Sequence, residues 1–234
     1  RNMVHLEFAQ ESEFLGYTTE TAEGEIVAIV ADGKPVDSAP IGTEVAVLLN
    51  QTPFYAESGG QVGDIGRIIG PEGEMEVNTT LKDPTGLIIH KGRLRSGRLR
   101  KGDTLTLLVD GFAREATARN HTATHLLHSA LRSVLGEHVK QAGSLVAPDR
   151  LRFDFTHFSQ VQTETLERIE SLVNQGIRAN VPTQVAEMAA EEAFKSGAMA
   201  LFEEKYGDRV RVVALEDISK ELCGGTHTAR TGNI

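Results

Sequence analysis

The chain has 234 residues, of which 40% are hydrophobic and 24% are charged, as is typical of a globular protein with an apolar core. No run approaches the roughly eighteen apolar residues of a membrane span, and the polar, acidic first residues do not resemble a signal peptide. The single cysteine excludes an internal disulfide, so we predict a soluble cytoplasmic protein. The net charge of −9 argues against a general polyanion binder, and any contact with RNA must therefore be local.

The first half of the chain alternates short β-branched runs with Gly, Pro, Asp and Asn. Asp32-Gly33 is typical of a two-residue hairpin turn. This spacing predicts an antiparallel barrel or sandwich. The expected strands are Glu25 to Ala31, Thr43 to Leu49, Ile65 to Ile69, Met75 to Thr79, Gly86 to His90 and Thr104 to Val109.

The pattern changes near Asp110, where residues 112–135 contain good helix formers and no interior Gly or Pro. Gly136 is placed to end this helix. Spacing predicts that its core face consists of Leu127, Ala130, Leu131 and Val134.

The rest of the chain mixes strands and helices, which predicts an α+β fold with a β-rich part at 1–111 and a second part at 112–234. An amphipathic helix is expected at 163–179, with an apolar face of Leu166, Ile169, Leu172, Val173 and Ile177. The other expected elements are strands at 143–146 and 151–155, a short extended piece at 183–185, a helical region at 191–206 interrupted by Gly197, a strand at 210–215 and a Gly-rich loop at Cys223.

Two histidines, His121 and His125, lie four residues apart on the predicted long helix, so both imidazoles project from one face and can grip one ion. Alone this is a weak signal. A zinc-protease helix needs Glu directly after the first His, and Thr122 takes that position, which excludes a metalloprotease. His128 lies about 10 Å of rise from His121, too far to share an ion, and we expect it beside the site or on the surface.

The second half of the signal is Cys223-Gly224-Gly225-Thr226-His227, where glycines permit the tight turns that bring a thiolate and an imidazole together. A lone cysteine is commonly an inert core residue, but this one lies in a Gly-Gly loop. With the helical pair, these residues form a set of three imidazoles and one thiolate that suits zinc.

Two further segments are candidates for contact with RNA. Residues 91–101 hold six basic residues and no acid, and Arg93, Arg95, Arg98 and Arg100 can bind phosphates, although a solvated hairpin face explains the run equally well. Gly59, Gly60 and Gln61 either let the backbone approach an RNA end or form a structural turn, and they lack the Gly-Lys-Ser/Thr ending of a phosphate loop.

The pairing of His-Thr-Ala-Thr-His with Cys-Gly-Gly-Thr-His resembles the editing domains of alanyl-tRNA synthetases and the free-standing AlaX deacylases, and more distantly that of threonyl-tRNA synthetase. Three further segments look like the bacterial-type alanyl enzymes, and the resemblance runs from about Phe14 to Ile234. These segments are Thr52 to Asp64, Gln141 to Val146 and Arg152 to His157.

The resemblance implies a β-barrel-like subdomain followed by a zinc-binding α+β editing core that hydrolyses the ester of alanine tRNA wrongly charged with serine or glycine. It also implies that Gln141 lines the catalytic pocket, that Thr124 tunes which amino acid is accepted, and that the chain is a module of a longer synthetase. The aminoacylation domain of that synthetase, where ATP and alanine bind, would be its partner. The implied zinc ligands are His121, His125, Cys223 and His227.

The residues leave two mechanisms open, because four protein ligands normally mark a closed structural site and catalytic zinc usually keeps a water position. Either one ligand is displaced or zinc only positions the substrate. Gln141 has no usable proton chemistry and would orient water or the carbonyl oxygen. The alternatives are a free-standing AlaX-type deacylase and a non-catalytic zinc module that binds tRNA.

Overall fold

The computed structural model describes residues 11–200 and 207–234 and divides into two compact units. The first unit contains the residues up to Ser58 together with 62–114, and the second contains 59–61 and 115–234. The sequence places the boundary at 111/112, three residues earlier. The assignment of Gly59 to Gln61 to the second unit is not foreseen by the sequence, and it decides the role of that segment.

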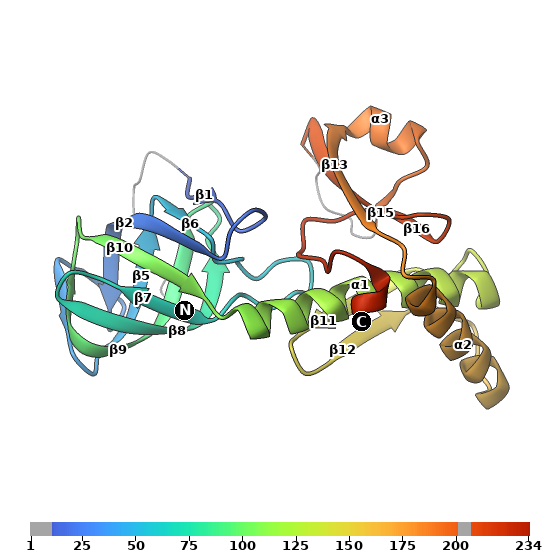
Figure 1. Ribbon diagram of the computed structural model, residues 1–234, viewed down its shortest axis with the longest axis horizontal. Helices are drawn as coiled ribbons and strands as arrows, with labels where there is room; N and C mark the ends of the chain where they lie inside the picture. Colours follow the sequence, from blue (N-terminus) through green and yellow to red (C-terminus); the bar gives the residue numbers. More distant parts are fainter. Residues whose placement is uncertain (1–10, 201–206) are drawn as a thin grey trace. The chain divides into compact units, whose positions relative to one another are not determined.

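The first unit is a closed antiparallel barrel of six strands, paired in the order β10, β7, β8, β9, β5, β2 and back to β10 (Figure 1). The predicted barrel or sandwich is therefore a barrel. Its strands are β2 (Thr21–Ala31), β5 (Glu44–Leu49), β7 (Gly66–Ile69), β8 (Gly73–Lys82), β9 (Ile88–Arg100) and β10 (Thr104–Val109). Shorter strands are β1 (Glu13–Phe14), β3 (Lys34–Val36), β4 (Ser38–Pro40) and β6 (Gln51–Thr52).

Period-two alternation fills the barrel. Val45, Val47 and Leu49 of β5 point inward and are at most 4% exposed, as are Leu105 and Leu107 of β10. Each such side chain contributes about 2 kcal/mol when it is fully buried. The Asp32-Gly33 turn has φ of 50° and 73°, the two positive values that a two-residue hairpin turn needs.

A buried ion pair lies in the first unit. Arg114 and Asp64 have side chains only 6% and 5% exposed, and the guanidinium also donates to the carbonyls of Gly16 (2.9 Å) and Pro53 (2.7 Å). The Asp64 carboxylate accepts a further bond from the Tyr55 amide at 2.7 Å. Every group of the pair therefore has a protein partner, which such burial requires.

His90 of β9 is a second buried polar group of this unit. Its Nδ1 lies 3.0 Å from the Val47 carbonyl, which can only accept, so Nδ1 carries the proton. Its Nε2 lies 2.8 Å from the Thr52 hydroxyl and is therefore the acceptor. Burial lowers the pKa of His90 to about 4, and the imidazole is neutral at neutral pH.

The second unit carries most of α1 (Gly111–Leu135), the hairpin β11 (Gln141–Val146) with β12 (Leu151–Phe155), and α2 (Thr163–Ala179). Gly136, with φ of 118°, ends α1 as predicted. Ala130 and Leu131 are buried against Ile169 of α2. A four-stranded sheet follows in the order β13, β15, β16, β14. Its strands are β13 (Thr183–Ala189), β14 (Met199–Ala200), β15 (Arg209–Leu215) and β16 (Ser219–Leu222). Helix α3 (Ala190–Lys195) follows β13, and the short helix η1 (Thr231–Asn233) comes last.

Several expectations for this unit are wrong. Leu166 is 51% exposed, because it lies in the first turn of α2, outside the packed face of that helix. The helical region expected at 191–206 ends at Lys195, and Met199–Ala200 instead pairs in parallel with β16, a strand that the sequence did not indicate. Residues 201–206 of that expected helix lie outside the described residues. Among the helices of the described part, none is both long and apolar enough to cross a membrane.

Candidate metal centre

Helix α1 and the loop after β16 bring four potential ligands together in the second unit. His121 and His125 stack on α1 with ring centroids 5.3 Å apart and an interplanar angle of 8°. Cys223 follows β16 directly, and its amide donates to the Arg211 carbonyl of β15 at 3.0 Å. With His227, one ligand atom from each of the four residues lies within 4.8 Å of all the others.

The Cys223 thiol lies at the middle of this cluster. Its Sγ is 3.4 Å from His121 Nε2 and 3.3 Å from His227 Nε2. Nε2 of His125 is buried and has no hydrogen-bond partner among the described residues. A buried polar atom without a partner is costly, and here it faces a set of donors that a metal ion would use.

The other nitrogen of each histidine is held by an oxygen atom. Nδ1 of His121 lies 2.7 Å from Gln61 Oε1, and Nδ1 of His227 lies 3.1 Å from the Thr122 hydroxyl. Nδ1 of His125 contacts the Glu221 carboxylate. The oxygens of Gln61 and Glu221 can only accept, so Nδ1 of His121 and of His125 carries a proton and Nε2 of each ring faces the cluster, while Thr122 holds the orientation of the His227 ring.

Glu221 serves two histidines at once. Its second oxygen lies 2.6 Å from Nδ1 of His128, and both histidines and the carboxylate are buried. The carboxyl pKa falls to about 2, because the attraction of His125 and the hydrogen bonds from His125 and His128 outweigh the cost of burial. His128 therefore lies beside the site and is not exposed, and it is held by the carboxylate that holds His125.

The electrostatics of the cluster favour a thiolate. Burial opposes ionisation of Cys223, but the adjacent imidazoles of His121 and His227 outweigh it and hold the thiol pKa well below its usual range. Burial, aided by the neighbouring His121, lowers the pKa of His227 to about 3. Burial also disfavours the charge on His125, but Glu221 and Cys223 raise its pKa to about 10. A bound metal ion would displace the proton of His125.

These features fit a borderline-soft divalent metal ion. One thiolate and three imidazoles are the ligand types that zinc sites use, at spacings of four residues within each half. The oriented Nδ1 atoms and the unpartnered Nε2 of His125 are what a site prepared for such an ion should show. The described residues therefore could hold a metal here.

Comparison with known proteins agrees with this geometry. Residues 1–112 match the family described as class II (A) tRNA synthetases, and residues 210–234 match the second additional domain of threonyl- and alanyl-tRNA synthetases. The alanine–tRNA ligase of Desulfosudis oleivorans is 54% identical over 94% of this chain, and that of Thermus thermophilus is 55% identical over 95%. This chain belongs to the alanine–tRNA ligase family.

The matched region is only a part of these relatives. The chain covers 25% of the Desulfosudis oleivorans ligase and 26% of the Thermus thermophilus and Thermotoga maritima ligases, the last being 52% identical. It thus spans about a quarter of the length of each. The second-additional-domain match, residues 210–234, contains Cys223 and His227 but stops short of the α1 histidines.

Two residues that the family resemblance implies for catalysis lie in the second unit. Thr124 is buried on α1, one residue before His125, and its hydroxyl donates to the Asn120 carbonyl at 2.8 Å. Gln141 is half-buried at the start of β11, where it pairs with Phe155 next to a bulge. Their roles in substrate selection and catalysis stay predictions.

The two candidate RNA segments differ in their surroundings. Gln61 is fully buried with its amide inside the metal centre, so its side chain lies in the site and not on an RNA-facing surface. Gly60 lies against Ser144, where an added Cβ would meet the Ser144 carbonyl at 2.7 Å. The four arginines of β9 remain exposed, but each forms an ion pair with a carboxylate from outside residues 91–101. These pairs are Arg93 with Glu44, Arg95 with Glu76, and Arg98 and Arg100 with Glu72.

Sequence reasoning missed the residues that orient the ligands. The sequence does not single out Glu221, indicates no orienting role for Thr122 or Thr226, and predicts an RNA contact for Gln61. Local spacing carries no signal for Gln61 or Glu221, because they lie 60 and 96 residues from the histidines that they contact. Thr122 is the exception, since it follows His121 directly.

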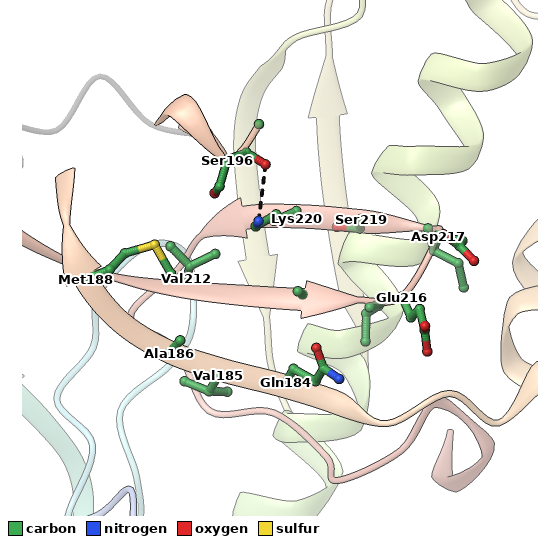
Figure 2. Close-up of a pocket in the computed structure, with 14 residues that line it drawn as sticks. Gln184, Val185, Ala186, Met188, Ser196, Val212, Glu216, Asp217, Ser219 and Lys220 are labelled. Carbon is green, nitrogen blue, oxygen red and sulfur yellow. Dashed lines mark hydrogen bonds between the residues drawn. The ribbon is translucent and has the colours of Figure 1, made fainter. Parts of the chain in front are cut away.

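A separate pocket with a volume of about 550 Å³ lies on the four-stranded sheet (Figure 2). Gln184, Ala186 and Met188 of β13 face it together with Val212 of β15, and Lys220 donates to the Ser196 carbonyl at its edge at 3.1 Å. Its lining includes none of the four cluster residues. This pocket is therefore separate from the His/Cys cluster.

Proposed function

We propose that this chain is the editing module of an alanine–tRNA ligase, a zinc-dependent deacylase that releases serine or glycine from wrongly charged alanine tRNA. The observation that carries the proposal is the cluster of His121, His125, Cys223 and His227, with ligand atoms within 4.8 Å in a chain of this family. The two family matches, one of them to the additional domain shared by threonyl and alanyl enzymes, support it.

The bond to be broken joins the amino acid to the terminal ribose of the tRNA. Bound zinc supplies a Lewis acid that can lower the pKa of water or attract a developing oxyanion. The four cluster residues would hold that ion, and Gln61, Thr122 and Glu221 hold the three imidazoles in place around it. In this proposal the Gln141 amide orients the attacking water or donates to the ester carbonyl oxygen, because an amide cannot take up a proton at neutral pH.

The similar sizes of alanine, glycine and serine explain why an alanine–tRNA ligase needs an editing site. A pocket that accepts alanine cannot strongly reject glycine, which is smaller, or serine, which merely adds a hydroxyl. A second site spares alanine if it hydrogen-bonds the serine hydroxyl. The Thr124 hydroxyl donates to Asn120 and retains free acceptor capacity, so in this proposal it accepts a hydrogen bond from the serine.

The proposal includes a setting in the cytoplasm and two partners, namely the mischarged tRNA and the aminoacylation domain of the ligase. The arginines of β9 and the backbone of Gly59 and Gly60 remain candidates for contact with the tRNA. A second function is favoured by the closed ligand set: four protein ligands are typical of structural zinc, which would make this a non-catalytic module that binds tRNA.

The deciding experiment measures release of serine, glycine and alanine from alanine tRNA charged with each, using the zinc-loaded chain. We expect release of serine and glycine but not alanine, loss of activity with loss of zinc in Cys223→Ala, and loss of activity with zinc retained in Gln141→Ala. Gln175→Ala, at an exposed glutamine of α2, is the matched control and should stay active. Circular dichroism checks that each variant is folded.

A different result would support the second function, a non-catalytic module that binds tRNA. A folded, zinc-loaded chain that releases none of the three amino acids, both alone and within the complete ligase, would show that the metal has only a structural role. Activity of the isolated chain that does not increase within the ligase would favour a free-standing deacylase.

A further inference from the structure

The segment Gly59 to Gln61 is held inside the second unit by its backbone. The Val146 amide of β11 donates to the Gly60 carbonyl at 2.7 Å, and Gln61 forms a parallel bridge with Val146. The Gln61 side chain is completely buried. It is thus placed by the same unit that contains the metal ligands, although it comes from far earlier in the sequence.

Three hydrogen bonds hold the Gln61 amide within the cluster. Its NH₂ group donates to the Thr226 hydroxyl at 2.8 Å, and its carbonyl oxygen accepts from the Thr226 backbone amide at 2.9 Å. The same oxygen lies 2.7 Å from Nδ1 of His121. Thr226 lies between the ligands Cys223 and His227, so a single side chain holds ligand-bearing residues of the loop and of α1.

These contacts also decide the tautomer of His121. The backbone N–H of Thr226 must donate, which identifies the atom that it meets as the carbonyl oxygen of Gln61. An oxygen that can only accept requires a proton on Nδ1 of His121. Nε2, which faces Cys223 Sγ at 3.4 Å, is then left with the lone pair that a metal ion needs.

The loop is shaped around this contact. A Cβ built at Gly225 would lie 2.0 Å from His121 Cε1 and 2.7 Å from Gln61 Oε1, so only glycine leaves room for the imidazole and the amide to meet. The Arg211 guanidinium donates to the Gly225 carbonyl at 2.8 Å and holds the loop from its other side. The contact is therefore part of the packed structure of the loop.

We propose that Gln61 is a positioning residue of the metal centre: it fixes His121 in the ligating tautomer and holds the Cys223–His227 loop in the geometry that binds the ion. The Gly59-Gly60-Gln61 segment, which its composition suggests as an RNA contact, thereby becomes a part of the site. An effect of Gln61 on hydrolysis depends on the proposed function. An effect of Gln61 on metal affinity does not.

The test compares two replacements of similar size in the complete chain. Gln61→Met removes all three hydrogen bonds, whereas Gln61→Glu keeps an acceptor for Nδ1 of His121 and loses the donor to Thr226. Zinc affinity is measured by competition with a chromophoric chelator. Partners in this position typically change metal affinity about 10- to 100-fold, so we expect Gln61→Met to bind zinc that much more weakly and Gln61→Glu to stay within about tenfold of the parent.

A spectroscopic measurement separates positioning from general support of the fold. With Co²⁺ in place of zinc, the visible absorption reports the ligand geometry. We expect shifted bands for Gln61→Met and parent-like bands for Gln61→Glu, with Gln175→Met of α2 unchanged in both affinity and spectrum. Parent-like affinity and spectrum for Gln61→Met would overturn the proposal, as would an equal loss of thermal stability in both Gln61 variants with an unaltered Co²⁺ spectrum.

Deacylation adds a last readout that keeps the two proposals apart. If the parent chain releases serine, Gln61→Met should lose activity at limiting zinc and recover it in excess zinc. A failure to recover would show that Gln61 acts otherwise than through the metal, against this proposal. If the parent is inactive, the proposed function fails, and the affinity and Co²⁺ results alone decide the role of Gln61.

Discussion

The two units bury polar groups in contrasting ways. In the barrel unit, the Arg114 and Asp64 side chains satisfy each other and three backbone groups, and both nitrogens of His90 have partners. In the second unit, Glu221 and Gln61 satisfy one nitrogen of each α1 histidine of the cluster, but Nε2 of His125 has no hydrogen-bond partner within the described part of the chain, and three imidazoles converge on one thiol.

The difference indicates what each centre is for. A buried network whose every member has a protein partner makes a fold specific and needs nothing from outside. In the His/Cys cluster, the Nδ1 atoms already have protein partners, whereas the Nε2 atoms and the thiol face one another. Such an arrangement is suited to binding a metal ion. The barrel should therefore be indifferent to metal, whereas the second unit should depend on it.

The largest expected effect is that of metal removal on the second unit. Structural zinc sites supply on the order of 10 kcal/mol of binding free energy, and here much of it should appear as folding stability. A strong chelator should therefore accelerate hydrogen exchange in α1 and in β15 and β16 and leave the barrel strands unchanged, as measured by mass spectrometry of peptides. An equal effect on both units, or none, would contradict the contrast.

Breaking the ion pair of the barrel should have the next largest effect, in the opposite unit. Arg114→Leu leaves the Asp64 carboxylate buried without its cation, which typically costs about 3–5 kcal/mol. Urea unfolding followed by hydrogen exchange should show this loss in the barrel strands. The matched control is Arg67→Leu, because its pair with Glu74 is exposed and should change stability by less than about 1 kcal/mol.

Acid should destabilise the barrel through His90. The unfolded chain takes up a proton below its ordinary pKa of 6.5, whereas the folded chain resists until about pH 4, so barrel stability falls as pH drops through this window. The shift corresponds to about 3 kcal/mol. His90→Gln should remove this pH dependence, measured as the difference between variant and parent in barrel hydrogen exchange from pH 7 to pH 4. A parallel pH profile for the two proteins would rule the explanation out.

The smallest expected effect concerns the carboxylate behind the cluster. In Glu221→Gln an amide oxygen can accept from one imidazole N–H, but the NH₂ group then faces the other. We expect a 10- to 100-fold loss of zinc affinity, which equals about 1.4–2.8 kcal/mol. Glu216→Gln, at an exposed position just after β15, is the control and should bind zinc as the parent does. Equal affinities for the two variants would remove Glu221 from the site.

Local signals predicted several elements well. Helix α2 begins and ends at the predicted residues, Thr163 and Ala179, and β10 also has its predicted bounds. Apolar periodicity and turn residues act over a few positions, which is why they succeed there. They fail after Lys195, where Met199–Ala200 becomes a strand by pairing with β16, a partner about twenty residues away.

The four cluster residues could also be predicted from the sequence, because each half has its own spacing. His121 and His125 are one helical turn apart, and Cys223 and His227 flank a Gly-Gly loop. Gln61 was visible only as part of a Gly-rich segment, and composition predicted an RNA contact for it. Its burial depends on the pairing of Gly60 and Gln61 with Val146, which no short-range rule predicts.

By itself the sequence determined the α+β class and predicted a two-part organisation and four candidate ligands, since these follow from periodicity, turn residues and spacing along one helix or one loop. Only the tertiary structure decided that the β-rich part closes as a barrel, that His128 is buried, and which side chains orient the ligands. Each of those features requires residues far apart in the chain to meet, and Gln61 joins His121 and Thr226 across 60 and 165 positions. Such meetings are set by how complete elements pack, and no local pattern encodes them.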